Sequence, residues 1–262
     1  MFARHTRALL LRILMGVIFA GIGISQSPGQ TSGASDDSSR TKAASIIRKA
    51  REWIGPEERI DAIQTLRYSG EIIQFEDGGT RKGSFSMSFR KPDSQLVVIT
   101  FPDVETITGF NGYEGFNKIV SRTESGSFET EVQSMTSHEM RQFRATTLEN
   151  LYFFRPFPPE EGNPLYAGIR MDGGNETEIL TYNHPGGFTF SRQIDKATGR
   201  LIRTINPSGI ETIEEGETLI DGLRFPTRII GRSNGSTLYE LKPLSIQINP
   251  DLSENLFDYP RE

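Results

Sequence analysis

The spacing of apolar residues changes from a helical period to a strand period near residue 66. From Thr41 onward one set of apolar residues recurs every three or four positions: Ala43, Ile46, Ile47, Ala50, Trp53 and Ile54. Gly55 and Pro56 end this stripe, and Pro56 can open a second short helix with Glu57 in its first turn. The pattern therefore predicts two N-terminal helices ahead of the first strand.

From Leu66 onward apolar and polar residues alternate, as they do in a strand with one buried face. Phe85, Met87 and Phe89 alternate with serines and give the clearest such strand. Asn111-Gly112 is a strong hairpin sequence. Glycine-containing turn sequences then recur about every ten residues, at 172–175, 184–187, 195–199, 206–209, 221–222 and 234–235. This rhythm predicts a mainly β (α+β) protein built on one large antiparallel sheet.

One predicted helix interrupts the strands. Thr136 and Glu139 have the spacing of a capping box, and a helical apolar stripe follows: Met140, Phe143, Leu148, Leu151 and Phe154. A long sheet curls as it twists, and these few helices look too short to cover it. The pattern therefore predicts an apolar hollow inside a strongly curved sheet, with a filled sandwich core as the alternative that the pattern leaves open.

The first residues have the form of an export signal. Arg4, Arg7 and Arg12 precede the apolar run 13–24, and Gly23 and Ser25 are the small residues that cleavage after Ser25 requires. An uncleaved membrane anchor is the alternative. Residues 26–40 are rich in Ser and Gly and predict a disordered polar tether, so residues 41–262 are expected to form a single domain. We expect an exported protein.

Composition excludes several kinds of chemistry. The chain has no cysteine, which excludes disulfides, thiol chemistry and a lipid-anchored cysteine after the cleavage site. Loss of Arg4, Arg7 and Arg12 with no acid takes the formal net charge from −5 to −8, and no basic block suggests nucleic-acid binding.

Residues 26–262 contain two histidines, His138 and His184, and no Gly-x-Ser-x-Gly elbow. Both histidines are expected to be exposed structural residues. The sequence also lacks a metal-binding or nucleotide-binding motif, so we expect no enzyme activity, no metal and no cofactor. A hydrolase that uses one of these histidines is the alternative.

The end of the chain predicts its own anchor. A strand over residues 244–248 runs into Asn249-Pro250, where proline stops the pairing, and Phe257 is apolar enough to pin the last residues onto a core.

These motifs together resemble a known family over residues 42–260. The segments that carry the resemblance are REWIG at 51–55, IDAIQTLRYSG at 60–70, GSFSMSFRKPD at 83–93, GFNGYEGF at 109–116, IDKATGRL at 194–201, DGLRFP at 221–226 and the stretch 248–260. Their order resembles the LolA/LolB-like periplasmic lipoprotein-carrier superfamily, which includes the outer membrane lipoprotein-sorting protein homologues. The chain departs from a compact carrier by its tether and by extra strands after Gly162.

The resemblance implies an incomplete β-barrel with helices covering an apolar cavity for acyl chains. Placed on that fold, Phe85, Met87 and Phe89 would face the cavity, and Arg90 would contact the covering helices. Met140, Phe143 and Leu151 would form lid or cavity wall. Ordinary core packing for the apolar residues, and an ordinary edge-strand arginine for Arg90, are the alternatives.

The resemblance further implies an exported, periplasmic carrier of lipid or acylated lipoprotein that sequesters acyl chains. Its partners would be the lipid cargo and membrane-associated donor and acceptor proteins, and it would be a monomer. An envelope sensor or structural interaction module with a filled core on the same fold is the alternative.

Overall fold

The computed structural model describes residues 33–155, 159 and 161–260, so the predicted export signal lies outside the described residues. The helices are α2 (Gly33–Ile54), α3 (Glu57–Asp61), α4 (Ser137–Asn150) and the short 3-10 helix η1 (Tyr152–Phe154). The first strands are β1 (Thr65–Glu76), β2 (Gly79–Arg90), β3 (Ser94–Phe101), β4 (Val104–Phe110), β5 (Gly115–Arg122) and β6 (Phe128–Ser134). After α4 come β7 (Asn163–Asp172), β8 (Asn175–His184), β9 (Phe188–Asp195), β10 (Leu201–Ile205), β11 (Glu211–Glu215), β12 (Thr218–Ile220), β13 (Leu223–Phe225), β14 (Arg228–Ser233) and β15 (Ser236–Ile248).

Thirteen of these strands form one antiparallel sheet in the order β6-β5-β4-β3-β2-β1-β15-β14-β11-β10-β9-β8-β7, and β12 and β13 form a separate hairpin. The two halves of the chain meet where the last strand pairs with the first, with Leu66 opposite Ile248 and Ile72 opposite Leu241. β6 and β7 form the two edges, so the sheet is open. The predicted mainly β architecture with a curved, incompletely closed antiparallel sheet is confirmed.

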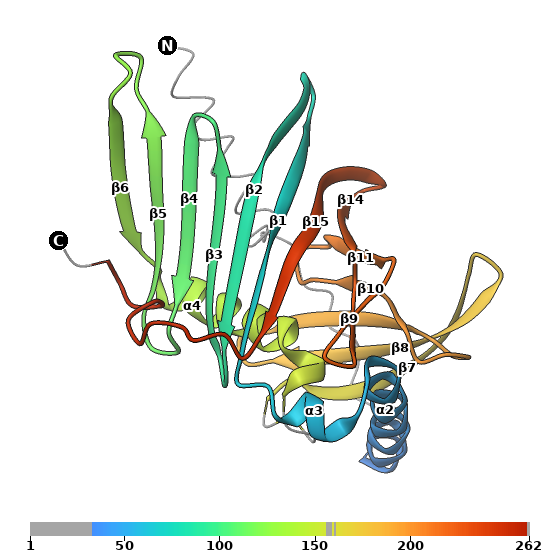
Figure 1. The fold of residues 1–262 in the computed structure, drawn as a ribbon. Helices are drawn as coiled ribbons and strands as arrows, with labels where there is room; N and C mark the ends of the chain where they lie inside the picture. Colours follow the sequence, from blue (N-terminus) through green and yellow to red (C-terminus); the bar gives the residue numbers. More distant parts are fainter. Residues whose placement is uncertain (1–32, 156–158, 160, 261–262) are drawn as a thin grey trace.

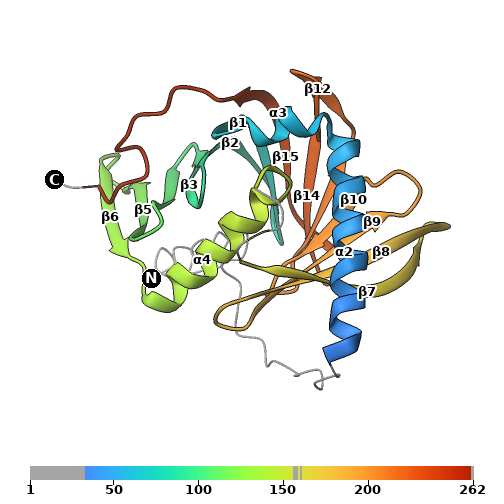
Figure 2. The same cartoon turned by 90° about the horizontal axis from the view of Figure 1, so that it is seen from below.

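The sheet is strongly curved. β1 to β6 stand side by side, whereas β7, β8 and β9 run across them at the other end of the sheet (Figure 1). Seen from below, the strands curl around α4, and α2 lies beside β7 to β10 (Figure 2). The helices therefore lie on the concave face of the sheet (Figure 2).

The predicted turns fall between paired strands. Six glycine-containing turns connect β7 to β8, β8 to β9, β9 to β10, β10 to β11, β12 to β13 and β14 to β15. Asn111-Gly112 begins a longer connection than a two-residue hairpin. The Asn111 Oδ1 atom accepts hydrogen bonds from the backbone N–H groups of Tyr113 and Glu114, and β5 begins at Gly115.

The N-terminal helix starts earlier than predicted. Residues 33–40, assigned from their polar composition to a disordered tether, form the first turns of α2. The Ser39 hydroxyl donates to the Tyr166 carbonyl at 3.0 Å, and the Lys42 ammonium lies 2.7 Å from the Glu178 carboxylate. Packing of α2 along the sheet thus holds a helix that its own composition does not favour, because tertiary contacts outweigh local propensity.

Asn249 joins the end of the last strand to the start of the first. Its φ is +51°, and its Oδ1 atom accepts hydrogen bonds from the backbone N–H groups of Gln64 and Thr65. Its Nδ2 atom donates to the Ala62 carbonyl at 3.1 Å. The chain then runs past the ends of the neighbouring strands toward β6 (Figure 2). Phe257 in this segment is buried, with its ring centroid 4.8 Å from the Arg90 guanidinium at the end of β2. The predicted C-terminal anchor is therefore present.

Candidate functional site

A cavity of about 240 Å³ lies between the concave face of the sheet and the helices. Its apolar wall combines side chains of β1, β2, β3 and β15 with residues of α2 and η1: Ile72, Phe85, Met87, Phe89, Val97, Ile99, Tyr239, Leu241, Ala50, Trp53, Ile54, Phe153 and Phe154. The wall follows from strand register. Met87 lies opposite Tyr68 on β1 and Val97 on β3, and residues paired in this way share one face of the sheet.

Three of the residues proposed from the sequence line this cavity. Phe85 and Phe89 are buried, and Met87 is half-buried with its side chain in the cavity wall. They occupy alternate positions of β2, so the strand period that suggested them also puts them on the same face.

The residues proposed on the central helix lie elsewhere. Phe143 is fully buried against Phe110, with ring centroids 6.0 Å apart, and Met140 packs onto the same cluster. Leu151 is buried in the core cluster beneath α2. Among the described residues, the cavity lining from α4 consists of Thr146, Glu149 and Asn150. The capping box of this helix is present as predicted: Glu139 N–H donates to the Thr136 hydroxyl, and Thr136 N–H donates to the Glu139 carboxylate.

Arg90 binds the C-terminal segment and not the covering helices. Its guanidinium donates to the carbonyl oxygens of Leu252, Ser253 and Glu254 at 3.0, 2.8 and 3.2 Å and lies 4.8 Å from the Phe257 ring centroid. The sequence analysis expected Arg90 to contact the covering helices, and this partner is wrong. Arg90 is the last residue of β2, and the C-terminal segment passes that end of the strand.

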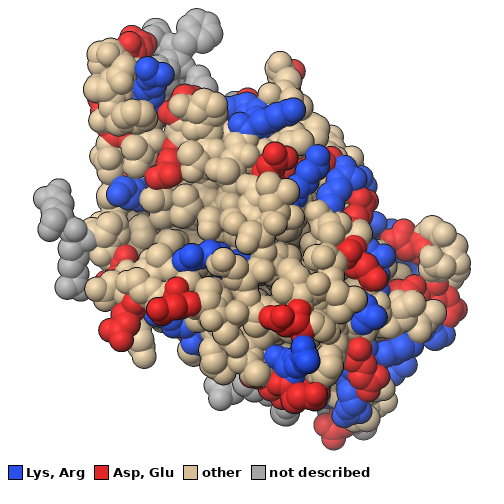
Figure 3. Space-filling view, viewed as in Figure 1, with Lys and Arg blue, Asp and Glu red and all other residues tan. Residues whose placement is uncertain are grey.

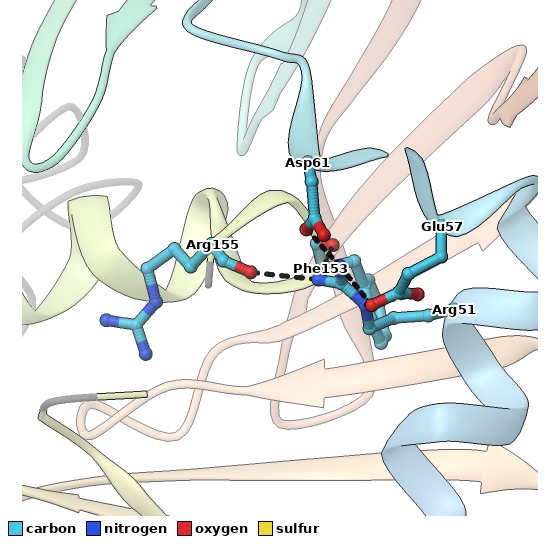
Figure 4. Close-up of polar contacts among 5 residues, drawn as sticks. All are labelled: Arg51, Glu57, Asp61, Phe153 and Arg155. Atoms are coloured by element: carbon cyan, nitrogen blue, oxygen red, sulfur yellow. Dashed lines mark hydrogen bonds and ion pairs between the residues drawn. The ribbon is translucent and has the colours of Figure 1, made fainter. Parts of the chain in front are cut away.

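Arg51 is the arginine that joins the covering helices (Figure 4). It lies on α2 with 2% of its surface exposed. Its guanidinium contacts both carboxylates of α3, at 2.7 Å from Glu57 Oε1 and 2.6 Å from Asp61 Oδ1. It also donates to the carbonyl oxygens of Phe153 and Arg155 at 2.7 and 2.8 Å. One side chain thus connects α2, α3 and η1, next to the cavity residues Ala50 and Phe153.

Burial alone would lower the pKa of Arg51, but hydrogen bonds and charge from Glu57 and Asp61 outweigh it and raise the pKa above the ordinary value. The group is therefore a permanent cation that requires its partners. Sequence reasoning missed its role, although Arg51 falls on the apolar stripe of α2, four residues after Ile47 and three before Ile54. A charged residue at such a position indicates a buried ion pair.

His184 is buried, which corrects its predicted exposure. Its Nε2 atom lies 2.8 Å from Glu149 Oε1, and each of these two side chains is 1% exposed. Arg192 Nη2 lies 3.2 Å from the other oxygen of Glu149. These contacts tie the last turn of α4 to β8 and β9. His138 is exposed on the first turn of α4, as predicted.

One part of the cavity wall is polar. Thr204 and Thr212 lie opposite each other on β10 and β11, and Arg192 on β9 lies opposite Thr204. Glu214 follows on the same face of β11, and all four residues line the cavity. Burial raises the pKa of the Glu214 carboxyl above its ordinary value, and the charges of Arg192 and Arg200 offset part of this rise. We call Arg192, Thr204, Thr212 and Glu214 the polar strip.

On the face drawn in Figure 3, the described residues form no continuous area of one charge. Lysine, arginine, aspartate and glutamate are interspersed over the face shown in Figure 3, with a broad uncharged area among them. Within the part of the chain that the structure describes, no helix has both the length and the apolar character needed to cross a bilayer. No group of His, Asp and Glu side chains among the described residues could hold a metal ion.

Comparison with known proteins supports the fold through structure and not through sequence. No family model matches the sequence, and no curated protein matches it. A putative outer membrane lipoprotein-sorting protein domain from Vibrio parahaemolyticus superposes with a TM-score of 0.53 at 11% identity over 84% of this chain and 97% of that chain. A DUF1329 family protein from Desulfovibrio piger gives 0.52 at 14% identity over 83% and 97%.

A LolA superfamily protein from Nitrosomonas europaea gives a TM-score of 0.52 at 15% identity over 83% of this chain and 97% of that chain. The matched proteins are thus almost completely covered by this chain. The resemblance expected from the sequence motifs is confirmed at the level of structure: the chain has the open, curved β-sheet fold of LolA superfamily proteins.

Proposed function

We propose that this chain is an exported carrier that sequesters the acyl chain of a lipid or acylated lipoprotein in the cavity between sheet and helices. The observation that carries the proposal is the apolar wall of the cavity, which presents Phe85, Met87 and Phe89 to the space between the sheet and the helices. Each methylene group transferred from water to such a wall contributes about 0.8 kcal/mol to binding. The fold supports the same function, since one neighbour is described as lipoprotein-sorting.

Cargo must enter and leave, and the covers are the elements that would separate. α3 and η1 are short, and the Arg51 contacts connect them to α2 at one point. We therefore propose that the carrier loads and unloads by separation of these elements around Arg51. In this proposal the protein acts in the periplasm as a monomer, without enzymatic activity, between a membrane-associated donor and an acceptor.

Binding of extractable lipid is the test. Protein purified without detergent is extracted and its lipids are identified by mass spectrometry. Met87→Trp fills the cavity without burying a charge and is expected to abolish most of the bound lipid. Val98→Trp, on the opposite face of β3, is the matched control and should retain it. If the wild-type protein carries no lipid and binds no fluorescent fatty acid, the carrier function is wrong.

A second candidate is an envelope sensor or structural interaction module on the same fold. The cavity volume favours it, because about 240 Å³ is slightly below the range of about 300–1,000 Å³ common for small-molecule pockets. Isolation of one stable protein partner, with no lipid in the same preparation, would support this function over the carrier.

A further inference from the structure

The polar strip faces the apolar wall across the same cavity. Tyr239 belongs to the apolar wall, and both it and Thr212 line the cavity; burial raises the pKa of the Tyr239 phenol, and the Thr212 side chain offsets part of this rise, so the two surfaces meet there. Thr204, Thr212 and Glu214 are only half-buried, although they lie on the concave face of the sheet and line the cavity. A cavity with one apolar side and one hydrogen-bonding side matches a ligand with a tail and a head.

The charged residues around the strip are already paired. Arg192 contacts the Glu149 carboxylate and lies over the rings of Phe153 and Tyr182, at 5.3 and 5.4 Å from their centroids. Arg200 donates to the backbone carbonyl of Glu214 at 3.1 Å. A charged headgroup buried here would either break one of these pairs or remain without an opposite charge. Both make the binding free energy less favourable, because the site has a low dielectric constant.

The strip therefore favours a headgroup that hydrogen-bonds without charge. The hydroxyl groups of Thr204 and Thr212 can each donate and accept. An anionic head would meet the Glu214 carboxyl, and a cationic head would meet Arg192 and Arg200, whereas a hydroxyl or ester group meets no repulsion. The volume restricts the tail, since about 240 Å³ is slightly below the range of about 300–1,000 Å³ common for small-molecule pockets.

We propose that the cavity takes a single-chain amphiphile with an uncharged, hydroxyl- or ester-bearing headgroup, the head on the polar strip and the tail against Phe85, Met87 and Phe89. This inference rests on the proposed carrier function and names its ligand class. Under this proposal, free fatty acids and lipid amines are not the preferred ligands of the cavity. Nor does the cavity hold several acyl chains at once.

Three probes with one chain length and different heads test the proposal: monodecanoylglycerol, decanoic acid and decylamine. Titration calorimetry with the delipidated full chain, below the micelle concentration of each probe, gives the affinities. We expect monodecanoylglycerol to bind about tenfold more tightly than either charged probe, since one mispaired buried polar group typically costs about that factor.

The paired substitution Thr204→Val and Thr212→Val keeps the shape and the strand preference of both residues while removing both hydroxyls. It should weaken monodecanoylglycerol binding about tenfold and leave the charged probes almost unchanged. Thr80→Val with Thr130→Val, at exposed strand positions, is the matched control and should change nothing. Thermal melting and circular dichroism verify that each variant is folded.

The possible outcomes separate the two proposals. Equal or tighter binding of decanoic acid or decylamine, or unchanged monodecanoylglycerol binding in the Thr204→Val, Thr212→Val variant, overturns the headgroup inference and leaves the carrier function standing. If no probe binds the wild-type protein and no lipid is extracted from it, both proposals are wrong.

Discussion

Arg51 Nη2 on α2 lies 2.6 Å from Asp61 Oδ1 at the end of α3. The two elements are joined by Gly55 and Pro56 and could pivot at this link, so the contact fixes their relative position. Asp61 is about half exposed, whereas Arg51 is almost completely buried. The arginine is thus the member of the pair that cannot regain water if the contact is lost.

Arg51→Met should lower the free energy of unfolding by about 2–4 kcal/mol. Methionine keeps part of the buried stem, but the carbonyl groups of Phe153 and Arg155 lose a charged donor in a buried site. Urea unfolding measures the change. Hydrogen exchange should also rise first in α3 and η1, because the substitution releases these covers while the sheet remains paired.

Arg48→Met is the control for this substitution, since Arg48 is an exposed arginine on the same helix. It should change stability by less than about 0.5 kcal/mol. Equal effects of Arg48→Met and Arg51→Met would contradict the structural role of Arg51.

The buried pair of Glu149 and His184 should show strong energetic coupling. Glu149→Ala is expected to cost about 3–5 kcal/mol, because Arg192 would remain buried without this carboxylate. His184→Ala should cost less, since Glu149 keeps its contact with Arg192. The two single variants and the double variant form a thermodynamic cycle. Additive losses in free energy of unfolding would show that the 2.8 Å contact contributes nothing of its own.

Local features of the fold were predictable from the sequence, and long-range contacts were not. The turns between β7 and β15, the apolar face of β2 and the capping box of α4 depend on residues a few positions apart, so periodicity and turn chemistry specify them. The pairing of β1 with β15 joins Leu66 to Ile248 and leaves no local sign in either strand.

The cavity residues show the same division. Phe85, Met87 and Phe89 were found because strand alternation places them on one face. The partners of Arg51, the contact of Arg90 with the C-terminal segment and the burial of His184 all depend on elements far away in the chain. Residues 33–40 were misassigned for a related reason: their polar composition indicates disorder, but docking of α2 on the sheet stabilises the helix.

Asn249 should tolerate glycine better than alanine. Its φ of +51° costs about 1 kcal/mol or more for a residue with a Cβ atom other than Asn or Asp, and its side chain makes hydrogen bonds to three backbone groups. Asn249→Ala loses the hydrogen bonds and also places a Cβ atom that does not suit a positive φ, so it should lower the free energy of unfolding by about 2–4 kcal/mol. Asn249→Gly loses only the hydrogen bonds.

The matched position is Asn234, which has a φ of +49° in the exposed turn between β14 and β15. Asn234→Ala should lower the free energy of unfolding by only about 1 kcal/mol, the strain of a positive φ in alanine. Chemical denaturation of the three variants and the wild-type protein measures these differences. If Asn249→Ala costs no more than Asn234→Ala, the side-chain hydrogen bonds of Asn249 do not stabilise the junction of β1 and β15.

Glu214 should make stability depend on pH in the direction opposite to that of a salt-bridged acid. Burial raises the pKa of its carboxyl above the ordinary 4.5, with Arg192 and Arg200 opposing. The folded state then holds the proton more tightly than the unfolded state, so this group lowers the free energy of unfolding as pH rises from the unfolded pKa through the folded pKa. The loss of stability caused by ionised Glu214 is complete above the folded pKa and absent below about pH 4.

Glu214→Gln removes this ionisation and should therefore be more stable than the wild-type protein at neutral pH. The gain should shrink on acidification and vanish below about pH 4, because the wild-type carboxyl is then protonated in both states. Urea titrations across this pH range measure the difference, with Glu71→Gln at an exposed position of β1 as the control that shows no such trend. A Glu214→Gln variant that is less stable at neutral pH would mean that the ionised carboxylate is held favourably by Arg192 and Arg200, and that the polar strip is suited to a charged ligand after all.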